Sequence, residues 1–284
     1  MVRRKFSIGN NAARVTIMIG EDLLDLGGQV ALVTGAGQSV GREIALTLAK
    51  HNAGGVAVND FVPERAAAVA AEIEALGVRA IPVVCDVGDL AAVKAAIATA
   101  SDKLGPVTLL VNNAGNAGPN AQIGRSPEFW ETDPAEWDRY FRTNTFGVMN
   151  CCHAAIPGMI KAGRGRIVTI VSDAGRVGEA RLAAYAAAKA AAGGFVRAIA
   201  KETGRYNINC NAIALSAILP PMEEEQARAF EESEQARKQV SRYVIRRFGR
   251  PTDVSGMALF LCSDAADFIT GQTYPVNGGY SFAV

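Results

Sequence analysis

Five short segments of the chain are continuously hydrophobic instead of alternating with polar residues. Strands with one face in water alternate, whereas strands of a parallel sheet that is covered on both faces are apolar throughout. We therefore predict five buried parallel strands. They cover residues 30–35 (VALVTG), 55–60 (GVAVND), 80–86 (AIPVVCD), 107–115 (VTLLVNNAG) and 166–172 (RIVTIVS).

Amphipathic stretches of helical length separate these strands. Residues 63–77 and 89–105 each end in a glycine, which is common just past a helix C-terminus. Strands that alternate with helices form right-handed β-α-β units, so we predict an α/β fold with a Rossmann-type, doubly wound parallel sheet. No linker or repeat divides residues 27–284, which we predict to be a single domain, and residues 1–26 are predicted to be an N-terminal extension.

Composition narrows the class of partner. The chain has 284 residues, of which 49% are hydrophobic, so it can bury a large core. A net charge of +1 without a dense basic block predicts a small-molecule partner and neither nucleic acid nor a membrane. The start lacks a signal-peptide pattern, and no stretch of about 20 apolar residues follows. The five cysteines lack ligand spacing, and His51 and His153 lack a partner pattern, so we expect a cytoplasmic protein with reduced thiols and no metal.

A glycine-rich turn follows the first predicted strand. Gly35, Gly37 and Gly41 let the backbone turn tightly at a helix N-terminus, whose free N–H groups bind a pyrophosphate. Asp60 ends the second strand about 20 residues further on, where a carboxylate accepts hydrogen bonds from an adenosine ribose. An ordinary strand-to-helix turn and a turn carboxylate are the alternatives for each feature taken alone.

Asp60 also predicts which dinucleotide binds. Its carboxylate would repel the 2′-phosphate of NADP, and neither Gln38 nor Ser39 supplies a cation to offset that repulsion. We therefore expect NAD in preference to NADP. Arg42, one residue past the last glycine, is the cation that would weaken this expectation if it reached the phosphate.

Small and polar residues end the third and fourth strands. Ligands of a doubly wound sheet bind outside the carboxyl ends of its strands. Asp86 is therefore expected to face the adenine amino group, Asn112 and Asn113 to brace the loops, and Gly115 to let the cofactor lie close. Taken by itself, the Asn-Asn-Ala-Gly sequence is better explained by turn chemistry.

The stretch AAYAAAKAAA, residues 183–192, follows the fifth strand. Tyr185 and Lys189 lie four residues apart, on one face of a helix, so the ammonium can sit beside the phenol. A neighbouring cation favours the ionised phenol, which predicts Tyr185 as general acid and base. Ser172 is placed to hydrogen bond the substrate oxygen while a nicotinamide gives or takes hydride. For an isolated Tyr-x-x-x-Lys, a half-buried tyrosine and a solubilising lysine would be the default interpretation.

Together these motifs resemble the short-chain dehydrogenase/reductase family over about residues 27–284. The shared set is Thr34 to Gly41 (TGAGQSVG), Asp60, Asp86, Val87, Asn112 to Gly115 (NNAG), Asn144, Ser172, Tyr185 and Lys189. The resemblance implies seven strands and a catalytic tetrad of Asn144, Ser172, Tyr185 and Lys189. In that family the asparagine holds a water that links the lysine to a proton relay, and the lysine also binds the nicotinamide ribose.

The resemblance extends to cofactor, assembly and subgroup. It implies a homotetramer with long helices at residues 134–162 and 182–204 in one interface. Residues 153–178 and 267–272 are similar to 3-oxoacyl-(acyl carrier protein) reductases and to 2-hydroxycyclohexanecarboxyl-CoA dehydrogenase. The cofactor-binding positions predicted are Gly35, Gln38, Ser39, Val40, Gly41, Asp60, Asp86, Val87, Asn113, Ala114, Gly115, Tyr185, Lys189 and Ile218.

Two departures from the family pattern concern the cofactor site. Ser39 replaces a glycine, so either its hydroxyl donates to the pyrophosphate or the loop shifts. Leu215 and Ser216 replace a Pro-Gly pair, and Pro220 replaces a threonine that often contacts the nicotinamide carboxamide. These changes leave nicotinamide positioning open. Residues 215–248 are predicted to form a substrate lid.

The leading hypothesis is an NAD-dependent oxidoreductase that interconverts a secondary alcohol and a ketone, with an alicyclic or acyl-thioester hydroxy compound as substrate. Arg176 and Arg181 are minor candidates to meet an anionic substrate group. The alternative is an NAD-binding regulatory or scaffold protein that kept the fold and lost turnover. The intact tetrad argues against that alternative, since a binder has no use for the chemistry of Tyr185 and Lys189.

Overall fold

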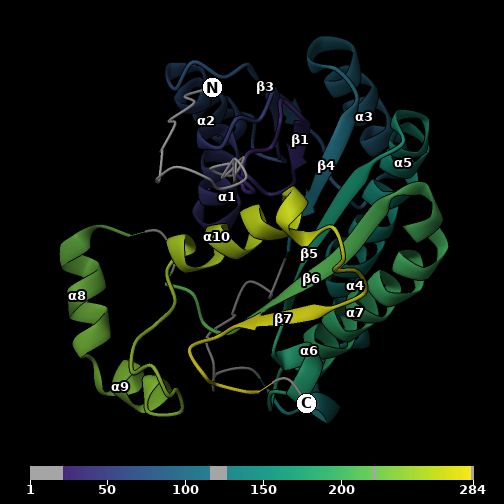
Figure 1. Ribbon diagram of the computed structural model, residues 1–284. Helices are drawn as coiled ribbons and strands as arrows, with labels where there is room; N and C mark the ends of the chain where they lie inside the picture. The colour runs from purple at the N-terminus through teal and green to yellow at the C-terminus, as the bar shows by residue number, and fades with distance from the viewer. Residues whose placement is uncertain (1–21, 116–126, 220–221, 283–284) are drawn as a thin grey trace, which may run out of the picture.

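A parallel sheet forms the centre of the computed structural model, which describes residues 22–115, 127–219 and 222–282 (Figure 1). Its seven strands have the order β3-β2-β1-β4-β5-β6-β7, and each neighbouring pair is parallel. The chain builds outward from β1 to β3 and then crosses back to β4, so β1 and β4 flank the switch point where such sheets bind ligands. The strands are β1 (Val30–Val33), β2 (Gly55–Asp60), β3 (Ala80–Val84), β4 (Val107–Asn112), β5 (Gly165–Ser172), β6 (Ile208–Leu215) and β7 (Thr273–Val276).

Helices cover both faces of the sheet (Figure 1). One face carries α1 (Ser39–Lys50), α2 (Pro63–Ala75) and α10 (Pro251–Cys262), and the other carries α3 (Leu90–Leu104), α5 (Gly147–Ala162) and α7 (Ala183–Thr203). The shorter helices are α4 (Trp137–Phe141), α6 (Ala174–Val177), α8 (Glu224–Glu232) and α9 (Glu234–Val240). This arrangement is the doubly wound, Rossmann-type α/β fold that the sequence predicts.

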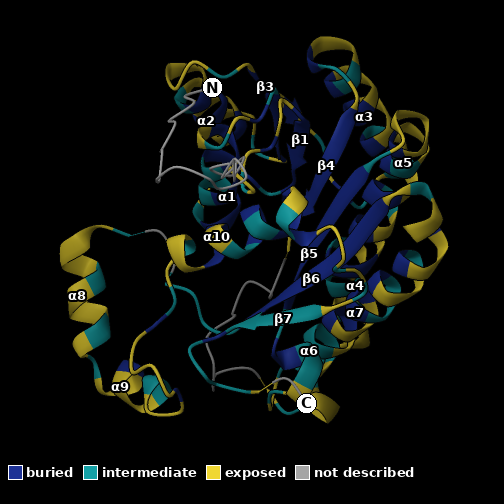
Figure 2. Ribbon diagram, in the orientation of Figure 1, coloured by how far each residue is buried: buried dark blue, intermediate teal, exposed yellow. Residues whose placement is uncertain are grey.

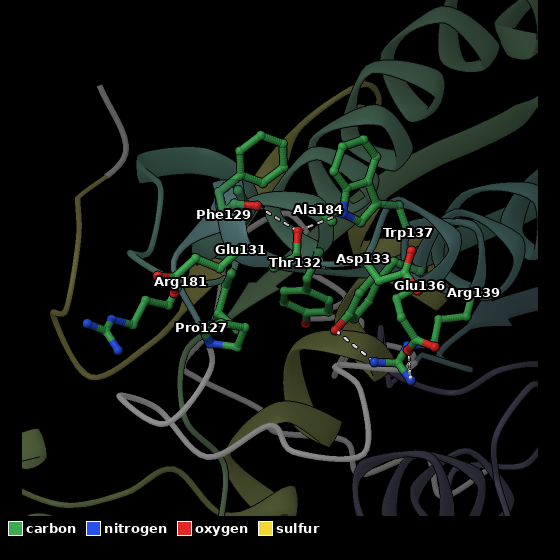
Figure 3. A pocket seen from close by; sticks show the side chains of 14 residues that line it. Pro127, Phe129, Glu131, Thr132, Asp133, Glu136, Trp137, Arg139, Arg181 and Ala184 are labelled. Carbon is green, nitrogen blue, oxygen red and sulfur yellow. Dashed lines mark hydrogen bonds and ion pairs between the residues drawn. The ribbon is translucent and has the colours of Figure 1, made fainter.

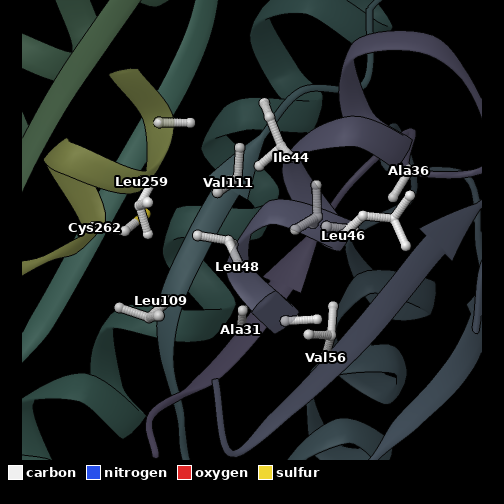
Figure 4. Close-up of a cluster of buried hydrophobic side chains, with 14 of the residues drawn as sticks. Ala31, Ala36, Ile44, Leu46, Leu48, Val56, Leu109, Val111, Leu259 and Cys262 are labelled. Atoms are coloured by element: carbon white, nitrogen blue, oxygen red, sulfur yellow. The ribbon is translucent and has the colours of Figure 1, made fainter. Parts of the chain in front are cut away.

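Each face of the sheet buries its own hydrophobic cluster. The central strands are buried along nearly their whole length (Figure 2). On the α1 face, Ile44 and Leu48 lie in one cluster with Leu259 and Cys262 of α10 and with Leu109 of β4 (Figure 4). Fully burying a side chain of this size contributes about 1.5–3 kcal/mol to stability. The continuous apolar segments are explained, because both faces of each central strand are covered.

The five predicted strands are confirmed, and β6 and β7 complete the seven that the family resemblance implies. The predicted helices at 63–77 and 89–105 appear as α2 and α3. Each is followed by a glycine in the left-handed region, Gly77 at φ +83° and Gly105 at φ +110°. Glycine adopts such angles without a Cβ clash, which is why it marks these helix ends.

Within the predicted lid, α8 and α9 are two short helices that stand away from the sheet (Figure 1). Ser233 separates α8 from α9 with an extended backbone, φ −63° and ψ 149°. Its hydroxyl accepts a hydrogen bond from the N–H of Ala236 at 3.2 Å and so caps the second helix. The lid itself remains a prediction.

The predicted N-terminal extension, residues 1–26, lies outside the described residues except for 22–26. Leu26 is fully buried against the core, and its N–H donates to the carbonyl of His51 at 2.9 Å. Within the described ranges, no helix combines the length and the apolar character that crossing a membrane requires.

Candidate active site

The turn from β1 into α1 forms a cradle of bare backbone. A Cβ on Gly35 would lie 2.9 Å from the Cα of Ala114, and a Cβ on Gly41 would lie 2.3 Å from the carbonyl oxygen of Gly35. Gln38 precedes the helix and, within the described chain, makes no side-chain cap to the first helical N–H groups. A backbone cradle at an uncapped helix N-terminus has the form that a pyrophosphate requires.

Ser39 has a backbone angle that usually belongs to glycine. Its φ of +50° lies in the left-handed region, which costs a residue other than glycine about 1–2 kcal/mol. Ser39 is the first residue of α1, and the next residue, Val40, is buried.

Asp60 faces the same turn. Its carboxylate is 4% exposed and accepts hydrogen bonds from the N–H groups of Gly37 and Val62, each at 3.0 Å. A Cβ on Gly37 would lie 2.6 Å from the Asp60 carboxylate and 2.5 Å from the Cβ of Arg65, so this glycine allows the close approach. The predicted pair of glycine turn and carboxylate is thus brought together.

The nearby cations occupy different positions. Arg42 forms an ion pair with Glu72 of α2, which holds its guanidinium on the helix surface. Arg65 of α2 lies beside Gly37 and was missed in the sequence analysis, because its approach depends on how α2 packs against the turn.

Asp86 and Val87 lie just beyond β3. The Asp86 carboxylate is half-exposed, pairs with Arg142 at 2.9 Å and accepts the N–H of Gly88 at 2.8 Å. The buried Val87 accepts a hydrogen bond at its carbonyl from the side-chain amide of Asn150 at 2.9 Å. Asp86 therefore keeps an open side while an arginine balances its charge.

Asn113 and Ala114 brace the turn between β1 and α1. The Asn113 side-chain amide donates to the carbonyl oxygens of Thr34 and Gly35, both at 3.0 Å. The N–H groups of Asn113 and Ala114 donate to the Thr34 hydroxyl at 3.0 Å. The Asn-Asn-Ala-Gly sequence is thus partly structural, as its turn chemistry suggests, and Asn112 is buried beneath it.

Ser172, Tyr185 and Lys189 meet at the carboxyl end of β5. The Ser172 hydroxyl lies close enough to the Tyr185 side chain to affect the pKa of the phenol. The Lys189 ammonium lies 6.0 Å from the centre of the Tyr185 ring and donates to the carbonyl of Ile170 at 2.9 Å. The lysine is 4% exposed, so it is fixed within the structure instead of extending into solvent.

Asn144 completes the group from a π-helical segment, Arg142–Phe146, in which the N–H of Gly147 bonds to the carbonyl five residues back. Asn144 is fully buried, and its amide donates to the Tyr140 carbonyl at 2.9 Å. A Cβ placed on Gly115 would lie 3.2 Å from Asn144 Oδ1 and 3.1 Å from Lys189 Nζ. π-Segments inside helices are frequent at functional sites, and here one brings an asparagine to the lysine.

Burial shifts the pKa values of both Tyr185 and Lys189. Burial raises the pKa of Tyr185, while the nearby Ser172 hydroxyl lowers the pKa by less. The net direction is opposite to the one that the helical spacing predicts, because burial disfavours the charged phenolate. Burial also lowers the pKa of Lys189 to about 8.

We expect Lys189 to make the ligand-free protein more stable as the pH rises from 8 to 10. An unfolded lysine holds its proton up to about pH 10.5, whereas Lys189 releases it near 8, so the unfolded state binds more protons in this window. Below pH 8 both states are charged and the full cost of burying the charge is present. The gain is about 2–3 kcal/mol, since one pKa unit corresponds to about 1.4 kcal/mol.

Chemical denaturation of the wild type and Lys189→Met at pH 7, 8, 9 and 10 measures this effect. The variant should lack the rise that Lys189 contributes, whereas Lys94→Met, on the exposed side of α3, should keep it. Parallel pH dependences for wild type and Lys189→Met would contradict the assignment.

The loop after β6 carries the unusual residues Leu215 and Ser216. Leu215 is buried at the strand end, and Ile218 pairs with Gly249 in an isolated parallel bridge. A Cβ on Gly249 would lie 2.5 Å from the Ile218 side chain, so the bridge depends on that glycine. Pro220, the other predicted change in this loop, lies outside the described residues.

A pocket of about 200 Å³ opens beside Tyr185 (Figure 3). The rings of Phe129 and Trp137 stack at 5.1 Å between centres, and Tyr140 meets Tyr185 edge to face at 6.4 Å. Aromatic walls of this kind suit an apolar ring system. The charged residues that line the pocket are three carboxylates and two guanidinium groups, namely Glu131, Asp133, Glu136, Arg139 and Arg181.

The two arginines proposed to meet an anionic substrate differ in placement. Arg176 pairs with Asp173 at 2.7 Å and donates to the Phe282 carbonyl at 3.1 Å, so it serves the C-terminal segment. Arg181 lines the pocket and pairs with Glu128 at 2.7 Å.

Two residues near the site were missed in the sequence analysis. Tyr140 lies four residues before Asn144, and that helical spacing could have identified it. Asp173 follows Ser172 directly, but its partner Asn277 is 104 residues away, so no local pattern marks it.

Comparison with known proteins shows which family the chain matches. A family model described as enoyl-(acyl carrier protein) reductase matches residues 35–281. The 7alpha-hydroxysteroid dehydrogenase of Escherichia coli (strain K12) is 37% identical over 262 residues, which are 92% of this chain and 98% of that protein. The 3-oxoacyl-(acyl-carrier-protein) reductase of Staphylococcus aureus (strain Mu50) is 39% identical over 250 residues, 88% of this chain and 96% of that protein.

A solved structure of 7 alpha-hydroxysteroid dehydrogenase, in complex with NADH and 7-oxo glycochenodeoxycholic acid, superimposes with a TM-score of 0.81 at 36% identity. The match covers 92% of this chain and 98% of that one. The fold, the glycine turn and these relatives define an oxidoreductase of the Rossmann type. The chain belongs to the short-chain dehydrogenase/reductase family, whose enzymes act on alcohol and carbonyl groups.

Proposed function

We propose that the protein is an NAD-dependent oxidoreductase that interconverts a secondary alcohol and a ketone. The observation that carries this proposal is the meeting of Ser172, Tyr185, Lys189 and Asn144 at the end of β5, next to the bare backbone of Gly115. A binding module has no need of a buried ammonium beside a phenol that lines a pocket.

The residues present fit a dinucleotide. The cradle of Gly35 and Gly41 would hold the pyrophosphate at the N-terminus of α1, and Asp60 would accept hydrogen bonds from the adenosine ribose. The remaining predicted cofactor contacts are those of Gln38, Ser39, Val40, Asp86, Val87, Asn113, Ala114, Gly115, Tyr185, Lys189 and Ile218. The NADH in the related hydroxysteroid dehydrogenase supports NAD as the cofactor.

The chemistry divides between the cofactor and the side chains. When bound, NAD would supply the hydride acceptor for oxidation of the alcohol, and NADH the hydride donor for reduction of the ketone. The Ser172 hydroxyl orients the substrate oxygen, and Tyr185 takes its proton in oxidation or supplies one in reduction. Lys189, when charged, favours the phenolate, and Asn144 holds the path by which the proton leaves.

The pocket beside Tyr185 favours an alicyclic substrate over an acyl thioester. Its stacked rings suit a flat or cyclic hydrocarbon, and its carboxylates outnumber its guanidinium groups, which disfavours a polyanionic carrier. The related enzymes act on a hydroxysteroid and on 3-oxoacyl groups, so both substrate classes belong in the test.

The test is reduction of NAD, followed by absorbance, with alicyclic, steroid and acyl-thioester alcohols. Turnover of at least one ring alcohol is expected. The second candidate, a regulatory or scaffold protein that binds NAD, would show NADH binding without turnover across the whole panel. The left-handed Ser39 and the altered residues Leu215 and Ser216 are the observations that keep this alternative in the test.

We also propose that the protein is located in the cytoplasm, a reducing compartment in which cysteines stay as free thiols. All five are free thiols within the described residues, and four of them are buried. Burial raises the pKa of Cys152 and Cys262 to about 12, which keeps these thiols protonated and unreactive.

We expect a homotetramer in solution. Phe146, Met149 and Ile160 are 49%, 40% and 39% exposed along the helix that the family resemblance places in an interface. An apolar face of this kind is rarely left in water by a monomer. Light scattering at micromolar concentration should give four times the chain mass, and Met149→Glu should reduce it. Leu76→Glu, at the exposed end of α2, is the control, and a monomeric wild type would contradict the expectation.

A further inference from the structure

The C-terminal strap, residues 277–282, ties the end of β7 to the residue that follows Ser172. The Asp173 carboxylate is 1% exposed and accepts hydrogen bonds from Asn277 at 2.6 Å and from the Ser281 hydroxyl at 3.0 Å. Arg176 donates to the same carboxylate at 2.7 Å and to the Ser281 hydroxyl at 3.1 Å. A buried carboxylate is costly unless donors surround it, and here the donors come from the strap and from α6.

The same strap holds the loop after β6. The Ser216 hydroxyl donates to the carbonyl of Asn277 at 3.2 Å, and the N–H of Asp173 donates to the carbonyl of Leu215 at 2.9 Å. The buried Tyr243 accepts the N–H of Ala217 at its hydroxyl, at 3.1 Å. Both residues of the replaced Pro-Gly pair are therefore bonded to the Asp173 and Asn277 region.

The far end of the strap is anchored to the residues after α9. Tyr280 is hydrogen bonded to Glu179 and Arg242, and the ring of Tyr243 packs against the Tyr280 ring at 5.4 Å. The N–H of Ile245 donates to the carbonyl of Gly278 at 2.8 Å. The strap thus lies between the predicted lid and the strand ends of the site, fixed on both sides.

We propose that Asp173, Asn277 and Ser216 are positioning residues that fix the loop after β6 relative to Ser172, and so set the place of the nicotinamide half of the cofactor. The inference rests on the proposed function, since it concerns the same site. It explains how a chain without the Pro-Gly pair keeps this loop in one conformation. Proline restricts a loop through its backbone and glycine permits tight turns, whereas this chain restricts the loop through side-chain hydrogen bonds.

The first test compares NADH with ADP-ribose, which lacks the nicotinamide, in Ser216→Ala. The variant removes one hydrogen bond, worth about 0.5–1.5 kcal/mol, so the Kd for NADH should rise about 3–10-fold. The Kd for ADP-ribose should stay within about twofold, because the cradle of α1 is untouched. Ser255→Ala is the control, since Ser255 is a buried serine on α10 that bonds to the carbonyl of Thr252. Neither Kd should change in the control.

Asp173→Asn provides a second measurement on the same group. Its kcat for alcohol oxidation should fall about 10–100-fold, because displacing reacting groups by about 1 Å has that effect. The primary deuterium isotope effect on kcat should rise, since hydride transfer becomes slower. A purely structural role would lower the melting temperature and leave both the isotope effect and the ratio of the two Kd values unchanged.

The outcomes are separable from those of the proposed function. A wild type that binds neither NADH nor ADP-ribose overturns the proposed function, and this inference with it. A wild type that binds both, with Ser216→Ala changing both Kd values equally or neither of them, overturns this inference alone. If Asp173→Asn does not fold, Ser216→Ala still decides, because it leaves the buried carboxylate and its donors in place.

Discussion

Tyr185→Phe is expected to lose most turnover and to keep both its fold and its affinity for NADH. The change removes one hydroxyl from a side chain whose ring stays in place against Tyr140. General acid and base catalysis is worth about 10²–10⁴-fold, so kcat should fall by that factor. Steady-state kinetics with the best alcohol of the panel, together with NADH titration by fluorescence, measures the two quantities.

The matched control for this change is Tyr206→Phe. Tyr206 lies in the short helical turn after α7, outside the group around Ser172, and its loss of a hydroxyl should leave kcat unchanged. Near wild-type turnover in Tyr185→Phe would rule out the assigned proton donor. A large loss of NADH affinity would indicate that the phenol serves binding and not chemistry.

Asp60→Ala is expected to reduce the preference for NADH over NADPH, because NADH should bind more weakly and NADPH more tightly. Two like charges about 4 Å apart repel by about 4 kcal/mol at an effective dielectric constant of 20, which after relaxation is still a preference of about tenfold or more. The variant loses the ribose contact with NADH and relieves the 2′-phosphate of NADPH. Fluorescence titration of both reduced cofactors gives the ratio directly.

Three further variants make the cofactor test specific. Asp60→Asn keeps an acceptor for the Gly37 N–H but removes the charge. It should therefore raise the affinity for NADPH and lower the affinity for NADH less than Asp60→Ala does. Arg42→Ala should leave the ratio unchanged, because its guanidinium is held by Glu72. Arg65→Ala tests the cation beside Gly37, and tighter binding of NADPH by the unmutated protein would show that Asp60 does not set the preference.

Much of the fold could be predicted because its information is local. The apolar segments at Val30–Val33 and Val107–Asn112 identify central strands without reference to the rest of the chain. The glycines of the β1 turn report a close backbone approach, since Gly41 has no space for a Cβ. Such features depend on residues that are close together in the sequence, so the sequence alone is enough to predict them.

The features that the sequence did not predict depend mainly on contacts between residues that are far apart in the chain. The direction of the Tyr185 pKa follows from burial, which the spacing to Lys189 does not report. The partners of Asp173 lie more than 100 residues away, and the approach of Arg65 to the turn follows from the packing of α2. Sequence periodicity also gave no sign that the helix around Asn144 has a π-turn, because a single wide turn changes the period too little to be seen.

That wide turn sets a limit on how the length of the chain can change. In an α-helix each residue advances the chain by about 100° and 1.5 Å, and the π-turn holds one residue more than an α-turn. Removing one residue from Arg142–Phe146 would convert the wide turn into a regular α-turn and take away the position from which Asn144 reaches the group around Lys189. The helix on either side would keep its direction, but the asparagine would no longer lie beside the lysine. Insertions and deletions among related chains should therefore accumulate in the loops on either side of this helix and be excluded from its middle.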